Sequence, residues 1–313
     1  GEVGRLVFLD YGRWRAAGNN TSSGNHVVKS DIVIKGGAND TGTGAVIFRA
    51  ESGRTFQYDG TFSGDGALKM TMSSTTAANF DFQGHENTAF TGTMQINGSL
   101  STVKFNTATG MGANPGVLKA KGLEIAYDGT VQFNNTSAIV VDQPNRGLYI
   151  STGGTIYTAG SVTWKGPVAF DAASTVLTKT GDGDFILDGT NTTASGTIAV
   201  SAGRVVAANP YAAGEITISS SSSGTGVLPS LAATAAEETA RRFESREYLF
   251  VPDGSASNTP EQNLAIATNR GWTIPDNYGL AGHWAVTLSQ EAVDGGVMIS
   301  ASGKINGFVI IIR

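Results

Sequence analysis

The sequence predicts a mainly β protein in which a β-solenoid is followed by a small α+β unit. Short segments that alternate apolar and polar residues recur about every 8 to 12 residues over the first two-thirds of the chain, as in proteins built from many short strands. Gly, at 42 of 313 residues, and Asn, Asp and Ser fill the intervals and supply turns. Residues 80–100 and 181–206 also share a Gly-centred pattern. Internal repetition of this kind favours a solenoid over a sandwich or a barrel.

The expected strands of this region share one buried face, and no convincing helix pattern interrupts residues 27 to 218. With three short strands per coil, roughly 190 residues make about eight coils. The segments expected as strands are Asp31–Lys35, Thr55–Tyr58, Leu68–Met72, Phe80–Gln83, Thr93–Ile96, Leu123–Ile125, Val131–Phe133, Ile139–Val141 and Thr197–Val200.

The repeat is a frame of apolar-x-Gly, polar residues, Gly-Thr-apolar-x-apolar and a further Gly. Gly at its corners permits positive φ and close approach of the backbone. In this alignment Gly84 matches Gly189, Gly92–Met94 matches Gly196–Ile198, and Gly98 matches Gly203.

Residues 177–191, LTKTGDGDFILDGTN, closely resemble the autotransporter-associated β-strand repeat. The strand Gly196–Val200 and the closing Gly203–Val205 continue the motif, and Asn145–Ile156 looks like its lead-in coil. The resemblance is weaker over 64–100, where Met and Phe replace the usual Leu. It implies a right-handed parallel β-helix that is exported to the bacterial surface, and it implies no enzyme activity.

The expected domain organisation has three parts: a β-helix over 1–218, a Ser/Gly linker over 219–226 and an α+β unit over 227–313. The linker reads SSSSSGTG, a composition typical of flexible connections. A solenoid has open ends that invite edge pairing, so we expect the last unit to cover one end, near Val205–Ile218.

Two helices are expected in the last unit. The Ala-rich segment Leu231–Glu247 has Glu and Arg at i,i+4 spacing. A shorter helix has Thr259 as N-cap, Pro260 at its first position and Gly271 as terminator. Strands are expected around Trp272–Ile274, Trp284–Leu288, Val297–Ser300 and Phe308–Ile312.

Composition excludes several classes of function. The chain has 26 acidic and 21 basic residues and lacks a basic patch, so we expect no nucleic-acid partner. We see no apolar run near the roughly 20 residues of a membrane span, and we expect no membrane insertion by this segment. The absence of Cys excludes disulfides, thiolate metal sites and cysteine nucleophiles.

No residue is assigned a catalytic, metal-binding or cofactor-binding role. His26, His85 and His283 are isolated, without metal-ligand spacing. Asp182, Asp184 and Asp188 fit a turn better than a calcium site, because the full calcium-loop pattern is absent. Paired carboxylates could hydrolyse a glycosidic bond, but nothing in the sequence marks a pair. The acids available on or near strands are Asp81, Glu124, Asp128 and Asp142.

Two groups of aromatic residues have different expected roles. Those of the N-terminal half are expected in the core: Phe56, Tyr58, Phe80, Phe82 and Phe90. A second group would form a carbohydrate-binding ladder if its members lie on an outer face. Its members are Tyr127, Tyr149, Tyr157 and Trp164.

Together these features predict an exported, surface-exposed bacterial protein that is adhesin-like. Its expected role is structural display and adhesion to a glycan or a host protein, without a cofactor and without enzyme activity. The alternative is a carbohydrate-active β-helix enzyme, such as a polysaccharide lyase or depolymerase. A groove with convergent carboxylates or basic residues would favour the enzyme over a display stalk.

Overall fold

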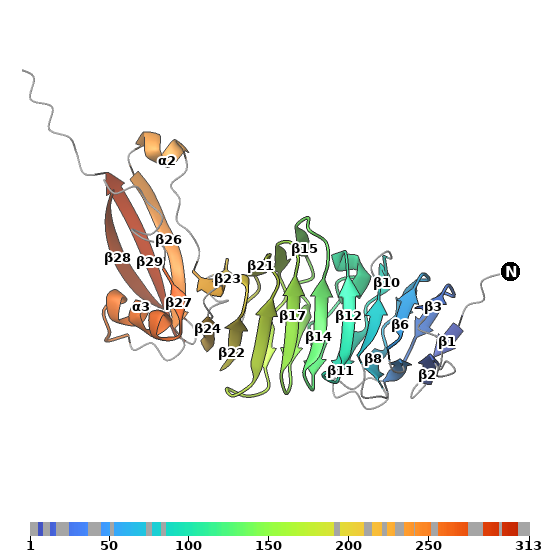
Figure 1. Ribbon diagram of the computed structural model, residues 1–313. Coiled ribbons are helices and arrows are strands. Elements are labelled where there is room, and N and C mark those ends of the chain that lie inside the picture. Colours follow the sequence, from blue (N-terminus) through green and yellow to red (C-terminus); the bar gives the residue numbers. More distant parts are fainter. Residues whose placement is uncertain are drawn as a thin grey trace, which may run out of the picture.

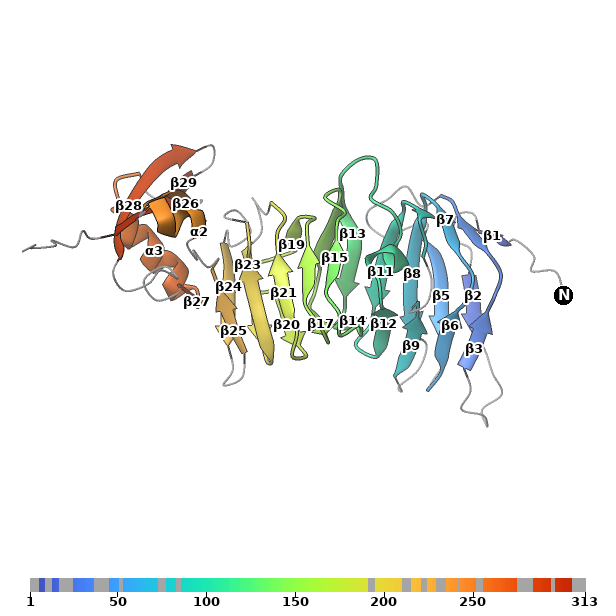
Figure 2. The same cartoon turned by 90° about the horizontal axis from the view of Figure 1, so that it is seen from above.

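The computed structural model is a parallel β-solenoid of about 7 turns, with 57% of the chain in strands and 8% in helices. Its strands lie side by side along a rod, with the N-terminal coils at one end and the C-terminal unit at the other (Figures 1 and 2). This confirms the expected fold class, and the number of turns is close to the eight expected. The structure describes residues 6–8, 13–16, 25–36, 45–50, 53–72, 77–82, 86–190, 195–209, 215–220, 224–228, 235–240, 242–251, 256–274, 284–293 and 296–305.

The strands of the solenoid form three faces. Face 1 is a seven-stranded sheet, face 2 is a nine-stranded sheet, and face 3 consists of a four-stranded sheet followed by a six-stranded sheet. Strands from successive coils pair in parallel within each face, as in β12–β14 and β14–β17 of face 2. Face 1 contains β2 (Arg13–Ala16), β5 (Val46–Ala50), β8 (Ala67–Met72), β11 (Thr93–Asn97), β13 (Lys119–Ala126), β16 (Arg146–Ile150) and β19 (Val168–Phe170). Face 2 contains β3 (Asn25–Val28), β6 (Thr55–Tyr58), β9 (Ala78–Asp81), β12 (Ser101–Phe105), β14 (Gly129–Phe133), β17 (Gly154–Thr158), β20 (Val176–Thr180), β22 (Ser195–Val200) and β24 (Glu215–Ser220). Face 3 contains β1 (Leu6–Phe8), β4 (Ile32–Ile34), β7 (Phe62–Gly64) and β10 (Ala89–Phe90), and then β15 (Ile139–Val141), β18 (Val162–Trp164), β21 (Asp184–Leu187), β23 (Gly203–Ala207), β25 (Gly224–Val227) and β27 (Trp272–Thr273).

Strict alternation along the strands creates the core. In β5, for example, Val46, Phe48 and Ala50 are buried, and Ile47 and Arg49 between them are partly exposed. The parallel register places each inward residue over an inward residue of the next coil, so side chains stack along the axis. The five aromatic residues expected in the core are all fully buried, which confirms that expectation: Phe56, Tyr58, Phe80, Phe82 and Phe90.

A short 3₁₀ helix, η1 (Ala108–Met111), separates the two sheets of face 3. Arg146, which is fully buried, holds the chain around this interruption. Its Nη1 donates to the carbonyls of Gly92 (3.0 Å) and Gly122 (3.2 Å), and its Nη2 donates to the carbonyl of Ala113 (2.7 Å). The guanidinium therefore provides hydrogen bonds to carbonyls at the corners of successive coils, where strand pairing supplies no donor.

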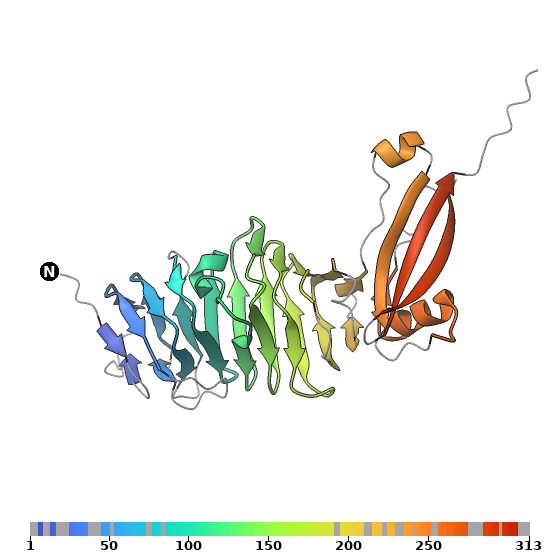
Figure 3. The same ribbon diagram turned by 180° about the vertical axis from the view of Figure 1, so that it is seen from behind.

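The C-terminal unit is a three-stranded antiparallel sheet with a helix packed against it (Figure 3). The order of its strands is β26 (Arg242–Val251), β29 (Gly296–Ile305) and β28 (Trp284–Val293), and its helices are α2 (Ala235–Ala240) and α3 (Pro260–Asn269). The N-terminus of α3 is as expected, because Thr259 and Gln262 form a reciprocal capping box. Gly271 follows with a φ of +86°, as a terminating glycine requires.

Trp272 joins this unit to the last coil. Its strand β27 pairs in parallel with β25, and its indole Nε1 donates to the carbonyl of Ile216 at 2.9 Å. The side chain is 1% exposed. The contact lies on the last coil, where the sequence predicts that the unit packs.

Three sequence-based expectations differ from the structure. Of the described residues in the helix expected over Leu231–Glu247, Ala235–Ala240 form α2, and those from Arg242 onward form β26. Pairing with β29 overrides local helix propensity here, and β26 is rich in aromatic and aliphatic residues that favour strands. The linker expected over 219–226 is wrong for all of its described residues, because Ser219 and Ser220 end β24 and Gly224–Gly226 belong to β25. The expected strand Phe308–Ile312 lies outside the described residues.

The third difference concerns the repeat alignment. The strand that follows Gly92 is β11 of face 1, whereas the matching Gly196 lies in β22 of face 2. Both glycines do allow a close approach. A Cβ on Gly92 would lie 2.0 Å from the carbonyl oxygen of Gly66, and one on Gly196 would lie 2.2 Å from the ring of Phe170. The Gly-centred pattern shared by the two segments therefore indicates a strand, a corner and a second strand, but it does not indicate on which face of the coil these strands lie.

Candidate functional site

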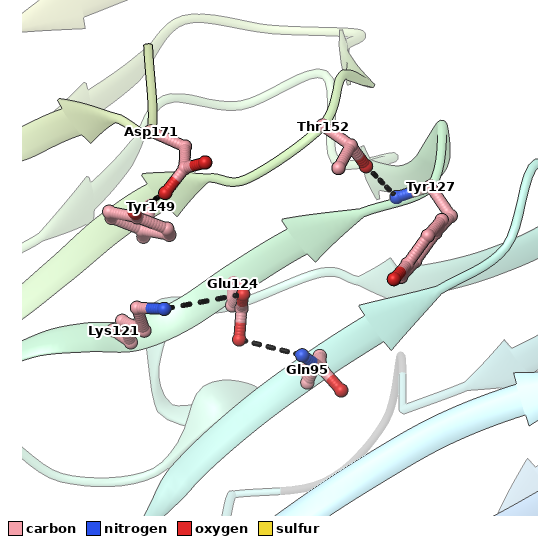
Figure 4. Close-up of polar contacts among 7 residues, drawn as sticks. All are labelled: Gln95, Lys121, Glu124, Tyr127, Tyr149, Thr152 and Asp171. Atoms are coloured by element: carbon pink, nitrogen blue, oxygen red, sulfur yellow. Dashed lines mark hydrogen bonds and ion pairs between the residues drawn. The ribbon is translucent and has the colours of Figure 1, made fainter. Parts of the chain in front are cut away.

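The outer surface of face 1 carries a row of polar residues from successive coils. Gln95 of β11 is in register with Glu124 of β13, which is in register with Tyr149 of β16. Alternation within these strands directs their neighbours Ile96, Ile125 and Ile150 into the core and this row to the outer side of the sheet. Glu124 is only 6% exposed there, because its neighbours in the row cover it. Asp171, directly after β19, extends the row by one coil (Figure 4).

Two hydrogen bonds, one ion pair and one cation–π contact link the row, and Figure 4 shows the side chains involved. The Nε2 of Gln95 donates to Oε2 of Glu124 at 2.7 Å, and Nζ of Lys121 lies 3.8 Å from Oε1 of the same carboxylate. Lys121 also lies over the ring of Tyr149, 4.2 Å from its centroid. The hydroxyl of Tyr149 donates to Oδ1 of Asp171 at 2.5 Å. Five side chains from four coils are thus held in fixed orientations. We call Gln95, Lys121, Glu124, Tyr149 and Asp171 the polar row.

The electrostatics of the row centre on Tyr149. Its pKa is raised to about 12, first by desolvation, then by the hydrogen bond to Asp171 and by the negative charges of Asp171 and Glu124. The phenol therefore stays protonated at neutral pH and acts as a hydrogen-bond donor. Two carboxylates on either side of one phenol give the row an alternation of donors and acceptors that suits hydroxyl-rich ligands.

A groove of about 300 Å³ adjoins the polar row on the same face. Its strands are β5, β8 and β11, and Lys69 of β8 is the register partner of Gln95. We call it the basic groove. It is lined by Ile47, Arg49, Lys69, Thr71, Met72 and Asn97.

The two cations of the basic groove have no partner in the part of the chain that the structure describes. The salt bridges of that part involve Lys121, Lys165 and Arg204, and no hydrogen bond to the side chain of Arg49 or Lys69 is present. The Nε of Arg49 is moreover buried and unsatisfied. Buried N–H groups are normally paired, so the described residues do not fully satisfy this guanidinium.

The acids that the sequence offered for catalysis are not brought together. Asp81 lies in β9 on face 2, Asp142 pairs with Lys165 at 3.2 Å, and Asp128 lies at the corner between β13 and β14. Only Glu124 belongs to the polar row, where its neighbouring acid is Asp171. Sequence reasoning missed Gln95, Lys121 and Asp171, and also Arg49 and Lys69. The alternation of apolar and polar residues indicated that strand residues such as Gln95 point outward. Which residues of the adjacent coils lie beside them depends on the number of residues in each coil, and the alternation does not give that number.

The condition for an aromatic ladder, that its four members lie on an outer face, is not met, because Trp164 is fully buried. Tyr149 and Tyr157 are partly exposed, on face 1 and face 2 respectively, so the four do not form one ladder. Tyr127 is 62% exposed at the corner beside the polar row, and it is held there by a bond from its backbone N–H to Thr152 (Figure 4). Tyr127 and Asp128 both have positive φ, at 50° and 61°, which makes a tight turn.

Asp184, one of the three clustered aspartates, is held by Arg204. The guanidinium Nε and Nη2 donate to its two oxygens at 2.9 and 2.7 Å, so a cation side chain already occupies the acceptors that calcium would need. Asp182 is exposed and Asp188, directly after β21, is partly exposed. Within the described residues no group of three His, Asp or Glu side chains could hold a metal ion. His85 and His283 lie outside the described residues, and His26 is described only as part of the backbone of β3.

Among the described residues, no helix has the length and apolar character needed to span a membrane. Comparison with protein-family models, with curated proteins and with solved structures finds no match for this chain.

Proposed function

We propose that this chain is an exported, adhesin-like bacterial surface protein that binds glycan through face 1. The observation that carries the proposal is the polar row. Its donors and acceptors come from four coils, and hydrogen bonds fix their orientation before any ligand arrives. Preorganised polar side chains on a rigid scaffold lower the entropic cost of binding.

Two further features support a glycan as the ligand. Tyr127 offers an exposed aromatic ring at the edge of the row, and such rings combine an apolar face with a polar edge that suits sugars. The basic groove continues the polar surface over two more strands, β8 and β5, which gives an extended binding surface for a polymer. The resemblance of residues 177–191 to the autotransporter-associated repeat supports export and display at a bacterial surface.

A glycan array tests the binding proposal. The parent chain is expected to bind a subset of glycans, and the double variant Asp171→Asn/Tyr127→Ala is expected to lose at least about tenfold in affinity, since it removes the exposed carboxylate of the polar row and the aromatic platform. Asp142→Asn is the matched control, because it removes a carboxylate that lies outside face 1. Equal binding by the double variant and the parent would exclude face 1 as the glycan site.

A polysaccharide-degrading enzyme is the second candidate. Two observations favour it. The basic groove brings Arg49 and Lys69 together, which is the feature expected of the enzyme alternative, and the hydroxyl of Tyr149 donates to the carboxylate of Asp171 on the same face. Incubation with a panel of polysaccharides, followed by assay of reducing ends and of unsaturated products, tests it. The enzyme proposal requires product formation that Tyr149→Phe abolishes; binding without product by the parent excludes it.

A further inference from the structure

We infer that the glycan recognised by face 1 is an acidic polysaccharide, whose anionic group is bound in the basic groove by Arg49 and Lys69. This inference rests on the proposed glycan-binding function and names the class of its ligand. It comes from a mismatch within the protein: two cations share a concave site of about 300 Å³ and neither is neutralised by a described side chain.

The arrangement of the groove suits one acidic group. Arg49 and Lys69 lie on the neighbouring strands β5 and β8, with Arg49 two residues along from the register partner of Lys69. Adjacent strands are about 4.8 Å apart, so both heads can reach a single carboxylate or sulfate between them. Thr71 and Asn97 are in register with each other and line the same groove, where they provide neutral hydrogen-bonding groups.

The guanidinium of Arg49 is incompletely satisfied by the protein. Its buried Nε–H has lost hydration without a compensating bond. The side chain as a whole is partly exposed and lines the groove, so an anionic oxygen there can form a charge-assisted bond with it, which is roughly twice as strong as a neutral bond.

The surroundings favour an acidic glycan over nucleic acid. The chain has 26 acidic and 21 basic residues, and Glu124 and Asp171 lie along the same face as the groove. A continuous polyphosphate that followed this face would pass both carboxylates and be repelled. An acidic glycan carries separated charges with hydroxyl groups between them. One of its charges fits the groove, while its hydroxyls meet Gln95, which is partly exposed, and further along the exposed Asp171 of the polar row.

Binding to hyaluronate oligomers, which carry a carboxylate on alternate sugars, compared with the same oligomers after methyl esterification, tests the inference. Esterification removes the charge and leaves the sugar chain intact. The parent chain is expected to bind the acidic form at least about tenfold more tightly, and Arg49→Gln/Lys69→Gln is expected to remove that preference while weak binding to the ester remains. A sulfated dextran, with neutral dextran as its reference, forms a second arm that distinguishes a sulfate from a carboxylate as the preferred group. The inference is supported if the parent chain prefers the acidic form in the carboxylate arm or in the sulfate arm, and if the groove variant loses that preference.

The matched control is Lys35→Gln/Lys104→Gln, which removes two positive charges outside face 1. It is expected to keep the preference for the acidic form. Circular dichroism shows whether each variant retains the β-rich fold.

The inference is overturned if the control loses the preference as the groove variant does, or if single-stranded DNA of equal charge binds as tightly as the acidic glycan. It is also overturned if the parent binds acidic and neutral glycans equally, a result that leaves glycan binding itself intact. Failure to bind any glycan instead overturns the proposed function.

Discussion

Lys179 is a buried cation in the part of the chain that resembles the autotransporter-associated repeat. Its side chain is fully buried, and Nζ donates to the carbonyls of Thr180 (3.0 Å), Gly181 (2.8 Å) and Ala202 (3.0 Å). Its register partners Ile156 and Val200 are inward apolar residues. A lysine at an inward position thus binds the corner carbonyls of two coils, which explains why a motif of apolar strands includes a charged residue.

Burial lowers the pKa of Lys179 from its ordinary 10.5 to about 8, against the smaller opposing effects of Asp184 and Asp182. Between these two pH values the unfolded chain therefore binds more protons at this site than the folded chain. The contribution of Lys179 to the free energy of unfolding should rise with pH from about 8 to about 10.5 and stay constant below 8.

Chemical denaturation of the parent and of Lys179→Met at a series of pH values between 7 and 11 measures this effect. The variant is less stable throughout because three carbonyls lose their donor, and it should also lack the rise. Parallel curves for the two proteins would show that Lys179 does not titrate in this range.

Leu187 and Asp188 test the register of β21. Leu187 is 1% exposed and lies in the core, as does Ile198 of β22, which confirms the expected orientation of both. Leu187→Asp buries an unpaired charge and should cost several kcal/mol, whereas Asp188→Ser should change the stability by less than about 0.5 kcal/mol. Thermal melts of both variants measure this. A Leu187→Asp protein that melts with the parent would contradict the register.

At the scale of elements, the interruption of face 3 at η1 depends on buried polar side chains. Asn87, which is fully buried, accepts from the N–H of Phe62 and donates to the carbonyl of Gly110, both at 2.7 Å. Arg146 bonds three further carbonyls and Oε1 of Gln143. These side chains replace the strand-to-strand hydrogen bonds that face 3 lacks between β10 and β15.

Arg146→Met should therefore destabilise the protein by about 3 kcal/mol or more, because it leaves several buried acceptors unsatisfied while the volume is nearly kept. Arg204→Met is the control. Its guanidinium is more than half exposed and pairs with Asp184 at the surface, so its loss should cost less than about 1 kcal/mol. Urea unfolding gives both values. Similar losses for the two variants would mean that Arg146 has no special role at the interruption.

At the scale of the whole molecule, the C-terminal unit covers the last coil. The N–H of Ile218 donates to the carbonyl of Arg270 at 2.6 Å, and Gly271 lies so close that a Cβ there would be 2.1 Å from the carbonyl oxygen of Ile218. These contacts and the strand β27 occupy backbone groups that would otherwise form an open edge.

A chain truncated after Leu228 should keep its β-rich circular dichroism but aggregate or oligomerise, because it exposes β25 and the apolar end of the core. Full-length Trp272→Ala should show a milder form of this effect. Light scattering and thermal melts measure both. A truncated chain that is monomeric and as heat-stable as the parent would exclude a capping role and leave residues 227–313 as an independent domain.

The solenoid and its core were determined by local sequence. Alternation identified the inward residues, Phe56 and Leu187 among them, because period two is a property of the strand itself. Thr259 and Pro260 identified the start of α3 for a similarly local reason, since a capping box involves only four residues.

Other features required the tertiary structure. Arg242–Glu247 became a strand because β29 pairs with it, and Gly224–Gly226 did so because the last coil continues. The candidate site belongs to this second group. Gln95, Glu124 and Tyr149 are neighbours only because coils of unequal length return the chain to the same register. Whether a residue points outward is decided within its own strand, whereas what lies beside it is decided by the coils above and below.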